Sequence, residues 1–341
     1  MQNLQQEIRS ILNDKHSLTQ EVSAKLAMLL NNPTLTSINL TGNYIQAAGA
    51  LSLAEALKVN RTLTAIDLAR NNIQAAGTLS LAEAFKVNTT LTSIDLWGNT
   101  IQAAVALSLA EALKVNTTLT TINLAYNDIQ AAGALSLAEA LKVNTILTSI
   151  NLCHNNIQAA GALSLTDALK VNKTLTSINL SVNKIQAAGA LSLAEALKVN
   201  TTLTSIDLEN NNIEDAGALG LTQALLINPC LLKLNGVDSP EIPKIIKRNH
   251  FYLSYRVDFL LIPEFFQKGI PTAENPDVVN PFLQLPMEVR IKILKSCVPS
   301  FVTKQSINRF ADFPERVRFF HQKIEKRSQT NSTNNLNGNF K

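Results

Sequence analysis

Cys153 and His154 are adjacent in the chain, and a thiol beside an imidazole is the usual starting point for a nucleophile with its general base. Both residues fall at the end of a predicted strand, where consecutive side chains face opposite directions. The sequence shows no evident third residue that would orient the imidazole. We therefore expect no catalytic residues at this pair and no enzyme activity.

Acidic and amide side chains recur at a second set of positions, which could bind cations. Asp67, Asp95 and Asp207 alternate there with the equivalent residues Asn39, Asn123, Asn151 and Asn179. Because these residues recur with the same period as the residues around them, a polar floor on successive strands is a simpler interpretation than a cation site. The three cysteines, Cys153, Cys230 and Cys297, show neither a CxxC pair nor metal-ligand spacing. We expect neither a metal nor a cofactor, and the cysteine usage fits a reducing compartment.

The elements that position these side chains belong to a 28-residue repeat, clearest in TTLTTINLAYNDIQAAGALSLAEALKVN, residues 117–144. Seven copies run from about Leu35 to Asn228, and a degenerate eighth begins at PCLLKLNG. An N-terminal segment ending in AKLAMLLNN lines up with the helical half of a copy. These flanking segments are the end caps that a stacked array needs.

Each copy predicts a strand, a turn and a helix. Apolar residues alternate over 91–96 (LTSIDL), as in a half-buried strand, and recur at i, i+3, i+4 and i+7 over 106–113, as in an amphipathic helix. Asn116 ends this helix and can adopt a left-handed conformation there. A glycine recurs near the start of the helices, but Val105 replaces it in the third copy. We therefore expect close packing, and not a positive φ, to be the reason for that glycine.

The pattern LxxIxLxxNxI resembles the leucine-rich repeat, and the 28-residue length with its GAxxLAxAL helix is similar to the ribonuclease-inhibitor-like subfamily. The resemblance implies an α/β solenoid, a curved horseshoe with a parallel sheet on the concave side and helices on the convex side. It also implies binding of a protein partner on the concave face, whereas a minority of the family regulate small GTPases. Finally, it implies a structural ladder of asparagines after each strand: Asn43, Asn71, Asn99, Asn127, Asn155, Asn183 and Asn211.

Differences between the copies concentrate just after the strand, at the end of the concave face and along the adjoining rim. Trp97, the only tryptophan, lies there with Arg70 and Tyr126, and these three residue types are enriched in interface hot spots. We expect a partner to contact this surface, and neutral drift after recent duplication is the alternative. The predicted partner-binding residues are Tyr44, Arg70, Trp97, Tyr126, Asp128, His154, Lys184 and Glu209. A GTPase-activating protein would instead use an exposed arginine such as Arg70 as an arginine finger.

After Asn235 the period is lost, and we divide the chain into an N-terminal helical cap (1–34), the repeats (35–236), a C-terminal cap with a small, mainly helical module (237–325) and a disordered tail (326–341). The segment IPKIIKRN predicts a helix that closes the last repeat. A following stretch, PFLQLPMEVRIKILKSC, resembles the start of an F-box, through Leu285, Pro286, Glu288, Val289, Ile293 and Leu294. An F-box implies docking to a Skp-family adaptor of cullin ubiquitin ligases. It would here follow the repeats instead of preceding them, and no later F-box helices are evident.

Two further resemblances concern bacterial proteins. Near-identical tandem copies with an F-box-like appendage are similar to effectors of intracellular bacteria, which would act in the host cytosol. Some bacterial ubiquitin ligases join leucine-rich repeats to a domain with a catalytic cysteine, but their repeats are shorter and their catalytic domains larger. Cys297 also lacks the nearby aspartate that such an enzyme implies, so packing is the simpler role for it.

Charge and composition limit the other partners. The formal net charge is +4, with the positive excess spread over the C-terminal third without an arginine-rich run, so we expect no nucleic-acid binding. No stretch of 18 apolar residues occurs, and no classical secretion signal is evident. Glycosylation acceptors recur at the same place in five of the seven copies, at Asn60, Asn88, Asn116, Asn172 and Asn200. Sugars there would crowd one edge in a secretory pathway, so we expect a cytoplasmic protein. We also expect a monomer.

Overall fold

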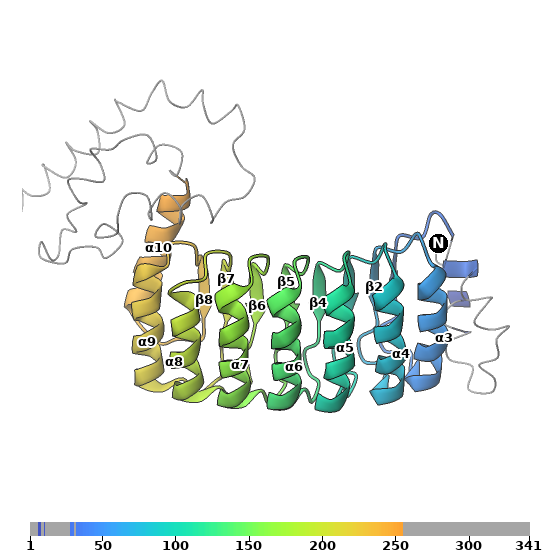
Figure 1. Cartoon of the computed structure of the whole chain (residues 1–341), viewed down its shortest axis with the longest axis horizontal. Coiled ribbons are helices and arrows are strands. Elements are labelled where there is room, and N and C mark those ends of the chain that lie inside the picture. Colours follow the sequence, from blue (N-terminus) through green and yellow to red (C-terminus); the bar gives the residue numbers. More distant parts are fainter. Residues whose placement is uncertain (1–5, 8–9, 11–27, 31, 255–341) are drawn as a thin grey trace, which may run out of the picture. The chain divides into compact units, whose positions relative to one another are not determined.

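The structure, a computed structural model, describes residues 6–7, 10, 28–30 and 32–254. Within this part of the chain, short strands and longer helices alternate without exception from residue 37 onward (Figure 1). The strands are β1 (Ser37–Asn39), β2 (Ala65–Asp67), β3 (Ser93–Asp95), β4 (Thr121–Asn123), β5 (Ser149–Asn151), β6 (Ser177–Asn179), β7 (Ser205–Asp207) and β8 (Lys233–Asn235). The helices are α3 (Gln46–Val59), α4 (Gln74–Val87), α5 (Ala103–Val115), α6 (Gln130–Val143), α7 (Gln158–Val171), α8 (Gln186–Leu197), α9 (Glu214–Ile227) and α10 (Glu241–Ser254).

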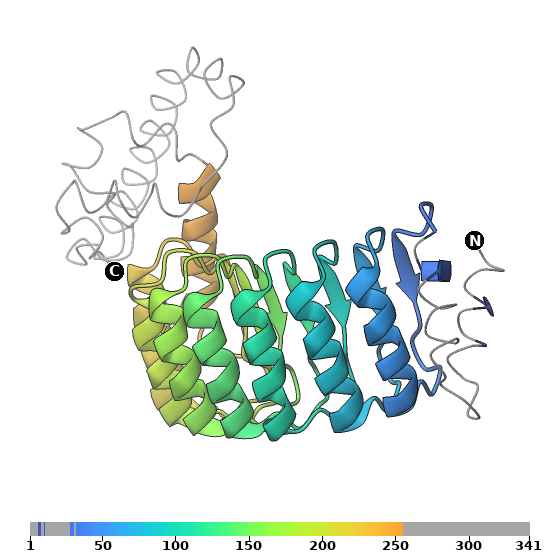
Figure 2. The same cartoon turned by 45° about the vertical axis from the view of Figure 1, so that its right-hand side comes forward.

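The strands form one parallel sheet in chain order from β1 to β8, and each residue pairs with the residue 28 positions further on, as Ile66 does with Ile94. Helices α3–α9 form a second layer on one side of this sheet, as Figures 1 and 2 show. Since β1 and β8 are the two edges, the sheet is open and not closed into a ring. The predicted α/β solenoid is thereby confirmed.

The core lies between the two layers and consists of the apolar residues that the periodicities predict. In the third copy Ile94 lies in β3 and Leu96 directly follows this strand, Leu109 and Leu113 lie in α5, and all four are at most 2% exposed. A three-residue strand cannot bury enough surface alone, so each copy depends on its neighbours for stability.

Asparagine side chains form hydrogen bonds with the backbone of the turn that follows each strand. The Asn155 amide donates from Nδ2 to the carbonyls of Leu124 and Leu152, at 2.9 and 3.1 Å. Its backbone N–H donates to Oδ1 of Asn183, 2.9 Å away in the next copy. Asn71, Asn99, Asn183 and Asn211 are buried in the same way, whereas Asn43 and Asn127 are half-buried. The predicted ladder positions thus connect consecutive copies through side-chain amides.

A second asparagine ladder runs along the opposite edge, between each helix and the following strand. Asn116 donates from Nδ2 to the Phe85 carbonyl of the previous copy at 2.7 Å, and its Oδ1 accepts from Leu119 N at 2.7 Å. Its φ of −68° and ψ of 132° are extended, so the left-handed geometry predicted at this position is wrong. The other members are Asn60, Asn88, Asn144, Asn172, Asn200 and Asn228.

This second ladder contains every predicted glycosylation acceptor. All five acceptor asparagines are buried, and each of their amide nitrogens donates to a carbonyl of the preceding copy. The folded chain therefore does not offer these amides to an enzyme. Their recurrence reflects a structural role and gives no information on the cellular compartment.

The last copy is covered by α10, which contains the helix predicted at IPKIIKRN. Ile242 and Ile245 are buried against the end of the array. Asn249 donates to the carbonyls of Asn228 and Leu231, at 2.9 and 2.8 Å, and so takes the place of the next ladder asparagine. At the other end, Leu30 is fully buried and its carbonyl accepts the Asn60 amide.

Candidate functional site

Four of the predicted partner-binding residues touch one another in sequence across four consecutive copies. The Arg70 guanidinium carbon lies 4.2 Å from the centre of the Trp97 ring. Trp97 meets Tyr126 edge to face, with ring centroids 5.3 Å apart and planes at 68°. Tyr126 stacks on His154, with centroids 4.4 Å apart and planes at 7°. We call Arg70, Trp97, Tyr126 and His154 the aromatic strip.

The backbone after each strand positions the strip. Arg70, Tyr126 and His154 occupy equivalent places in their copies, and all three have a φ between 53° and 55°. Each donates its N–H to a carbonyl of the next copy, as Tyr126 does to Cys153 at 2.8 Å. Because the copies stack in register, side chains at this place project in the same direction. A left-handed conformation is costly for these residue types, and it is held here by hydrogen bonds to neighbouring copies.

Trp97 comes from a different place, one residue earlier in its copy, at the end of the strand face. The backbone N–H of Trp97 donates to Oδ1 of Asp95 at 2.8 Å. The flanking residues at the equivalent place, Ala69 and Ala125, are small and buried. The next residue, Gly98, has no side chain in the column that holds Arg70 and Tyr126. The indole therefore has room to bridge Arg70 and Tyr126, which are two copies apart.

The strip is accessible to solvent. Tyr126 is 49% exposed, Arg70 and His154 are exposed, and Trp97 is half-buried. Among the residues that the structure describes, no carboxylate forms a salt bridge with Arg70. A row of π surfaces that ends in an exposed guanidinium without a carboxylate partner in the described part of the chain is suited to binding another molecule.

The other four predicted residues are not part of this chain of contacts. Tyr44 is 75% exposed in the first copy, and Lys184 and Glu209 are exposed in the sixth and seventh. Asp128 accepts a hydrogen bond from Gln130 Nε2 at 2.9 Å. Over residues 32–254, no ring or cation–π contact joins any of these four to the strip.

The polar column on the strands is occupied by internal hydrogen bonds. Asp95 accepts from Trp97 N through Oδ1 and from Asn123 Nδ2 through Oδ2, at 2.8 Å in both cases. Asp67 likewise accepts from Ala69 N and from Asn39 Nδ2. Within the described residues, no group of three or more His, Cys, Asp or Glu side chains could hold a metal ion. This column fixes the end of each strand and forms a polar floor beside the strip.

The Cys153–His154 pair is divided between two environments. The His154 ring stacks on Tyr126, while Cys153 is half-buried and its N–H donates to Asn151 Oδ1 at 3.0 Å. The imidazole thus belongs to the aromatic strip. The F-box-like residues and Cys297 lie outside the described residues, so the adaptor interpretation stays a prediction.

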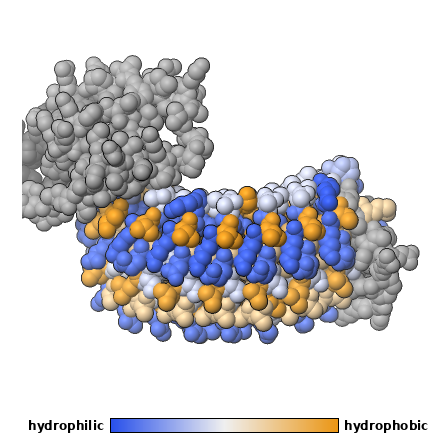
Figure 3. All heavy atoms as spheres, viewed as in Figure 1, coloured by the Kyte–Doolittle hydropathy of each residue, from blue (hydrophilic) through white to orange (hydrophobic). Residues whose placement is uncertain are grey.

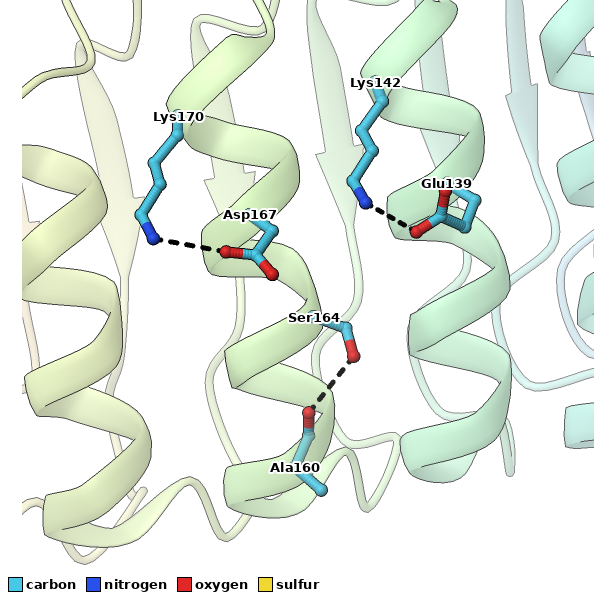
Figure 4. Close-up of polar contacts among 6 residues, drawn as sticks. All are labelled: Glu139, Lys142, Ala160, Ser164, Asp167 and Lys170. Atoms are coloured by element: carbon cyan, nitrogen blue, oxygen red, sulfur yellow. Dashed lines mark hydrogen bonds and ion pairs between the residues drawn. The ribbon is translucent and has the colours of Figure 1, made fainter.

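The helix face of the array is uniform from copy to copy. Rows of hydrophobic and hydrophilic residues alternate across the helices in Figure 3. Each helix from α3 to α7 exposes one leucine and one valine, such as Leu135 and Val143 in α6. Between them lie ion pairs such as Glu139–Lys142 at 2.6 Å and Asp167–Lys170 at 3.2 Å (Figure 4). Exposed pairs of this kind contribute about 0–1 kcal/mol each. A surface that changes so little from α3 to α8 distinguishes no single site.

Two features of the structure were not predicted from the sequence. The contacts within the aromatic strip join residues from two different repeat positions, that of Trp97 and that of Arg70, Tyr126 and His154. In the sequence, only the missing side chain of Gly98 indicates that the two positions can meet. The second asparagine ladder is visible in the sequence as an asparagine at the end of each copy's helix. Its structural role was not predicted, because five of these asparagines also lie in glycosylation acceptor motifs.

Comparisons with known proteins agree with the fold. The Leucine Rich repeat model matches six segments: residues 31–54, 59–82, 115–138, 143–165, 171–194 and 199–221. No curated protein sequence matches this chain. None of the helices in the described part of the chain has the length and apolar character needed to cross a membrane.

The solved structures that resemble this one include leiomodin-1 actin-binding site 2 and the leucine-rich repeat-containing protein LegL7 from Legionella pneumophila. The first is 26% identical over 44% of this chain and 91% of its own, with a TM-score of 0.40. The second is 18% identical over 67% of this chain and 85% of its own, with a TM-score of 0.44. The six matched segments, together with the parallel sheet and its single layer of helices, make the described part of this chain a leucine-rich-repeat solenoid.

Proposed function

We propose that this solenoid is a non-enzymatic scaffold that binds a protein partner on its strand face through the aromatic strip. One observation carries the proposal. The positions that vary between otherwise near-identical copies hold the four side chains that contact one another across four copies. Drift at independent positions gives no reason for a cation, an indole, a phenol and an imidazole to become neighbours.

The chemistry of the strip supports protein binding. Tryptophan, tyrosine and arginine dominate interface hot spots because they bury a large area while losing little conformational freedom. Arg70 lies over the Trp97 ring, so the guanidinium is already held in place before a partner arrives. Preorganisation of this kind lowers the entropic cost of association.

The same contact favours binding over GTPase activation. An arginine finger must enter the partner's nucleotide site and stabilise charge there. Arg70 would have to leave the Trp97 ring to do so, which would cost it the cation–π contact. Unchanged GTP hydrolysis across a panel of small GTPases, measured with and without this protein, is the result we expect.

The proposal is tested by affinity capture from cytosolic extract followed by mass spectrometry. Wild type is compared with a triple variant, Arg70→Ala, Trp97→Ala and Tyr126→Ala. A helix-face variant, Leu135→Ala with Lys142→Ala, serves as the control, since both residues are exposed there. We expect the control to retain the wild-type partners and the triple variant to lose them.

Calorimetry with the captured partner then gives the size of the effect. A hot-spot residue contributes at least about 2 kcal/mol, so Trp97→Ala alone should weaken binding about thirtyfold. If the triple variant keeps the same partners at equal strength, the strip is not the binding site.

A further inference from the structure

The helix-start glycines of the repeats are explained by close packing between neighbouring helices. A Cβ added at Gly133 would lie 2.6 Å from Ile129 Cγ2 of its own copy and 2.9 Å from the Ala106 Cβ of the preceding helix. At each of the equivalent glycines the corresponding distances are 2.4–2.7 Å and 2.8–3.0 Å: Gly77, Gly161, Gly189 and Gly217. Both distances are shorter than ordinary van der Waals contact, which begins at 3.4 Å. A side chain at this place requires the neighbouring backbone to move.

The third copy contains such a side chain. Val105 stands at the glycine position and is 5% exposed. The repeat register places Thr78 opposite it, where the other helices have alanine, and Thr78 is fully buried. A valine and a threonine therefore share the space that a glycine and an alanine fill elsewhere.

The rim of the third copy differs from that of the other copies. Helix α5 begins at Ala103, one residue later in its copy than its neighbours. Gln102 is extended, with a φ of −89°, whereas the equivalent residues in the other copies have a φ of 56° to 61°. Asp128, in the next copy, lacks the positive φ of its equivalents and pairs with Gln102 in an isolated bridge. Its N–H donates to the Ile101 carbonyl at 2.9 Å.

This altered rim adjoins the aromatic strip on both sides. Residues 98–102 directly follow Trp97, and Asp128 lies two residues after Tyr126. The matched segments of the Leucine Rich repeat model also leave out the third copy, between residues 82 and 115. The altered backbone thus lies in the copy that contributes Trp97 and in the next copy, which contributes Tyr126.

We propose that Val105, packed opposite Thr78, is a positioning residue that gives the rim beside the strip its own conformation and thereby determines which partner the strip accepts. Val105 is buried and contributes no surface to that partner. Its effect passes through the backbone of residues 100–102 to Asp128. This inference rests on the proposed binding function of the strip.

The structural half of the inference is tested with Val105→Gly, which restores the residue of the other copies and so should fold. Amide hydrogen exchange is measured at Asp128. We expect faster exchange in the variant, because the bond to the Ile101 carbonyl is lost when the rim returns to the common conformation. Val115→Gly, at the exposed end of the same helix, should leave Asp128 unchanged. Equal protection of Asp128 in wild type and Val105→Gly would overturn the packing argument.

The functional half uses a peptide selected on the wild-type protein from a random phage-displayed library and shown to depend on Trp97. We expect Val105→Gly to bind this peptide about tenfold more weakly and Val115→Gly to bind it as wild type does. If Asp128 is released but the peptide binds equally well, Val105 has no positioning role, while the strip stays a binding site. If no peptide depends on Trp97, both the proposed function and this inference fail.

Discussion

The imidazole of His154 lies flat against the phenol ring of Tyr126, with 4.4 Å between the ring centroids and 7° between the planes. The two residues are 28 positions apart and share the same left-handed backbone conformation, so their side chains leave the chain in the same direction. The repeat places the two side chains next to each other with the same starting direction, which allows the rings to stack. A repeat array can therefore build a flat recognition surface by placing aromatic residues in neighbouring copies.

This stacking should be measurable as an energetic coupling. In a double-mutant cycle with Tyr126→Ala and His154→Ala, we expect an interaction energy of about 0.5–1.5 kcal/mol from urea unfolding. A second cycle pairs Tyr126→Ala with Lys184→Ala, two copies away, and should give a coupling within about 0.5 kcal/mol of zero. Equal couplings in the two cycles would show that the ring contact contributes nothing to stability.

The same substitution at two helix glycines should have opposite effects on stability. Gly161→Ala brings a Cβ to 2.4 Å from Ile157 Cγ2 and should destabilise the protein by about 1–3 kcal/mol. Gly220→Ala meets only the end of the Leu191 side chain, which is 43% exposed and free to turn away. Helix propensity then dominates, and we expect a gain of about 0.5–1 kcal/mol. Thermal unfolding of both variants and of wild type tests this contrast: the midpoint should fall for Gly161→Ala and rise for Gly220→Ala.

The repeat made the fold predictable because its signals agree with one another. The alternation at Leu91, Ile94 and Leu96 and the helical stripe after it specify two apolar faces, and only stacking in register buries both. Within the site, the residue types at Arg70, Trp97 and Tyr126 indicated the surface. Their mutual contacts were not predictable, since they depend on left-handed backbone angles and on the empty space at Gly98. The rim at Gln102 is set by Val105 and Thr78, which are 27 residues apart in sequence.

The position of an asparagine within the first ladder should determine how much it contributes. Asn155 is buried, donates to three carbonyls and accepts from Ile129 N, so Asn155→Ala leaves several backbone groups unsatisfied. We expect a loss of at least about 2 kcal/mol in the free energy of unfolding. Asn43 is half-buried in the first copy, and its amide donates to the Thr41 carbonyl. Asn43→Ala should cost less than about 1 kcal/mol, and similar midpoints in urea for both variants would contradict this account.

Two substitutions where the fifth copy meets the sixth separate the structural role of the second ladder from its glycosylation motif. Asn172→Asp and Thr174→Ala each destroy the acceptor sequence Asn-Lys-Thr. The Asn172 amide donates to the carbonyls of Leu141 and Asn144, at 2.7 and 3.3 Å, and a carboxylate there would face both oxygens without a proton to donate. We expect Asn172→Asp to cost at least about 3 kcal/mol, because a buried charge would be left without a partner.

Thr174→Ala keeps the buried amide and the bond from the backbone N–H of residue 174 to Asn172 Oδ1. It should cost less than about 1 kcal/mol, as expected for a half-buried side chain outside the core. Urea unfolding of both variants checks the contrast. If the two substitutions destabilise the protein equally, the ladder is not the reason that asparagine recurs here, and the hydroxyl two residues later has a structural role of its own.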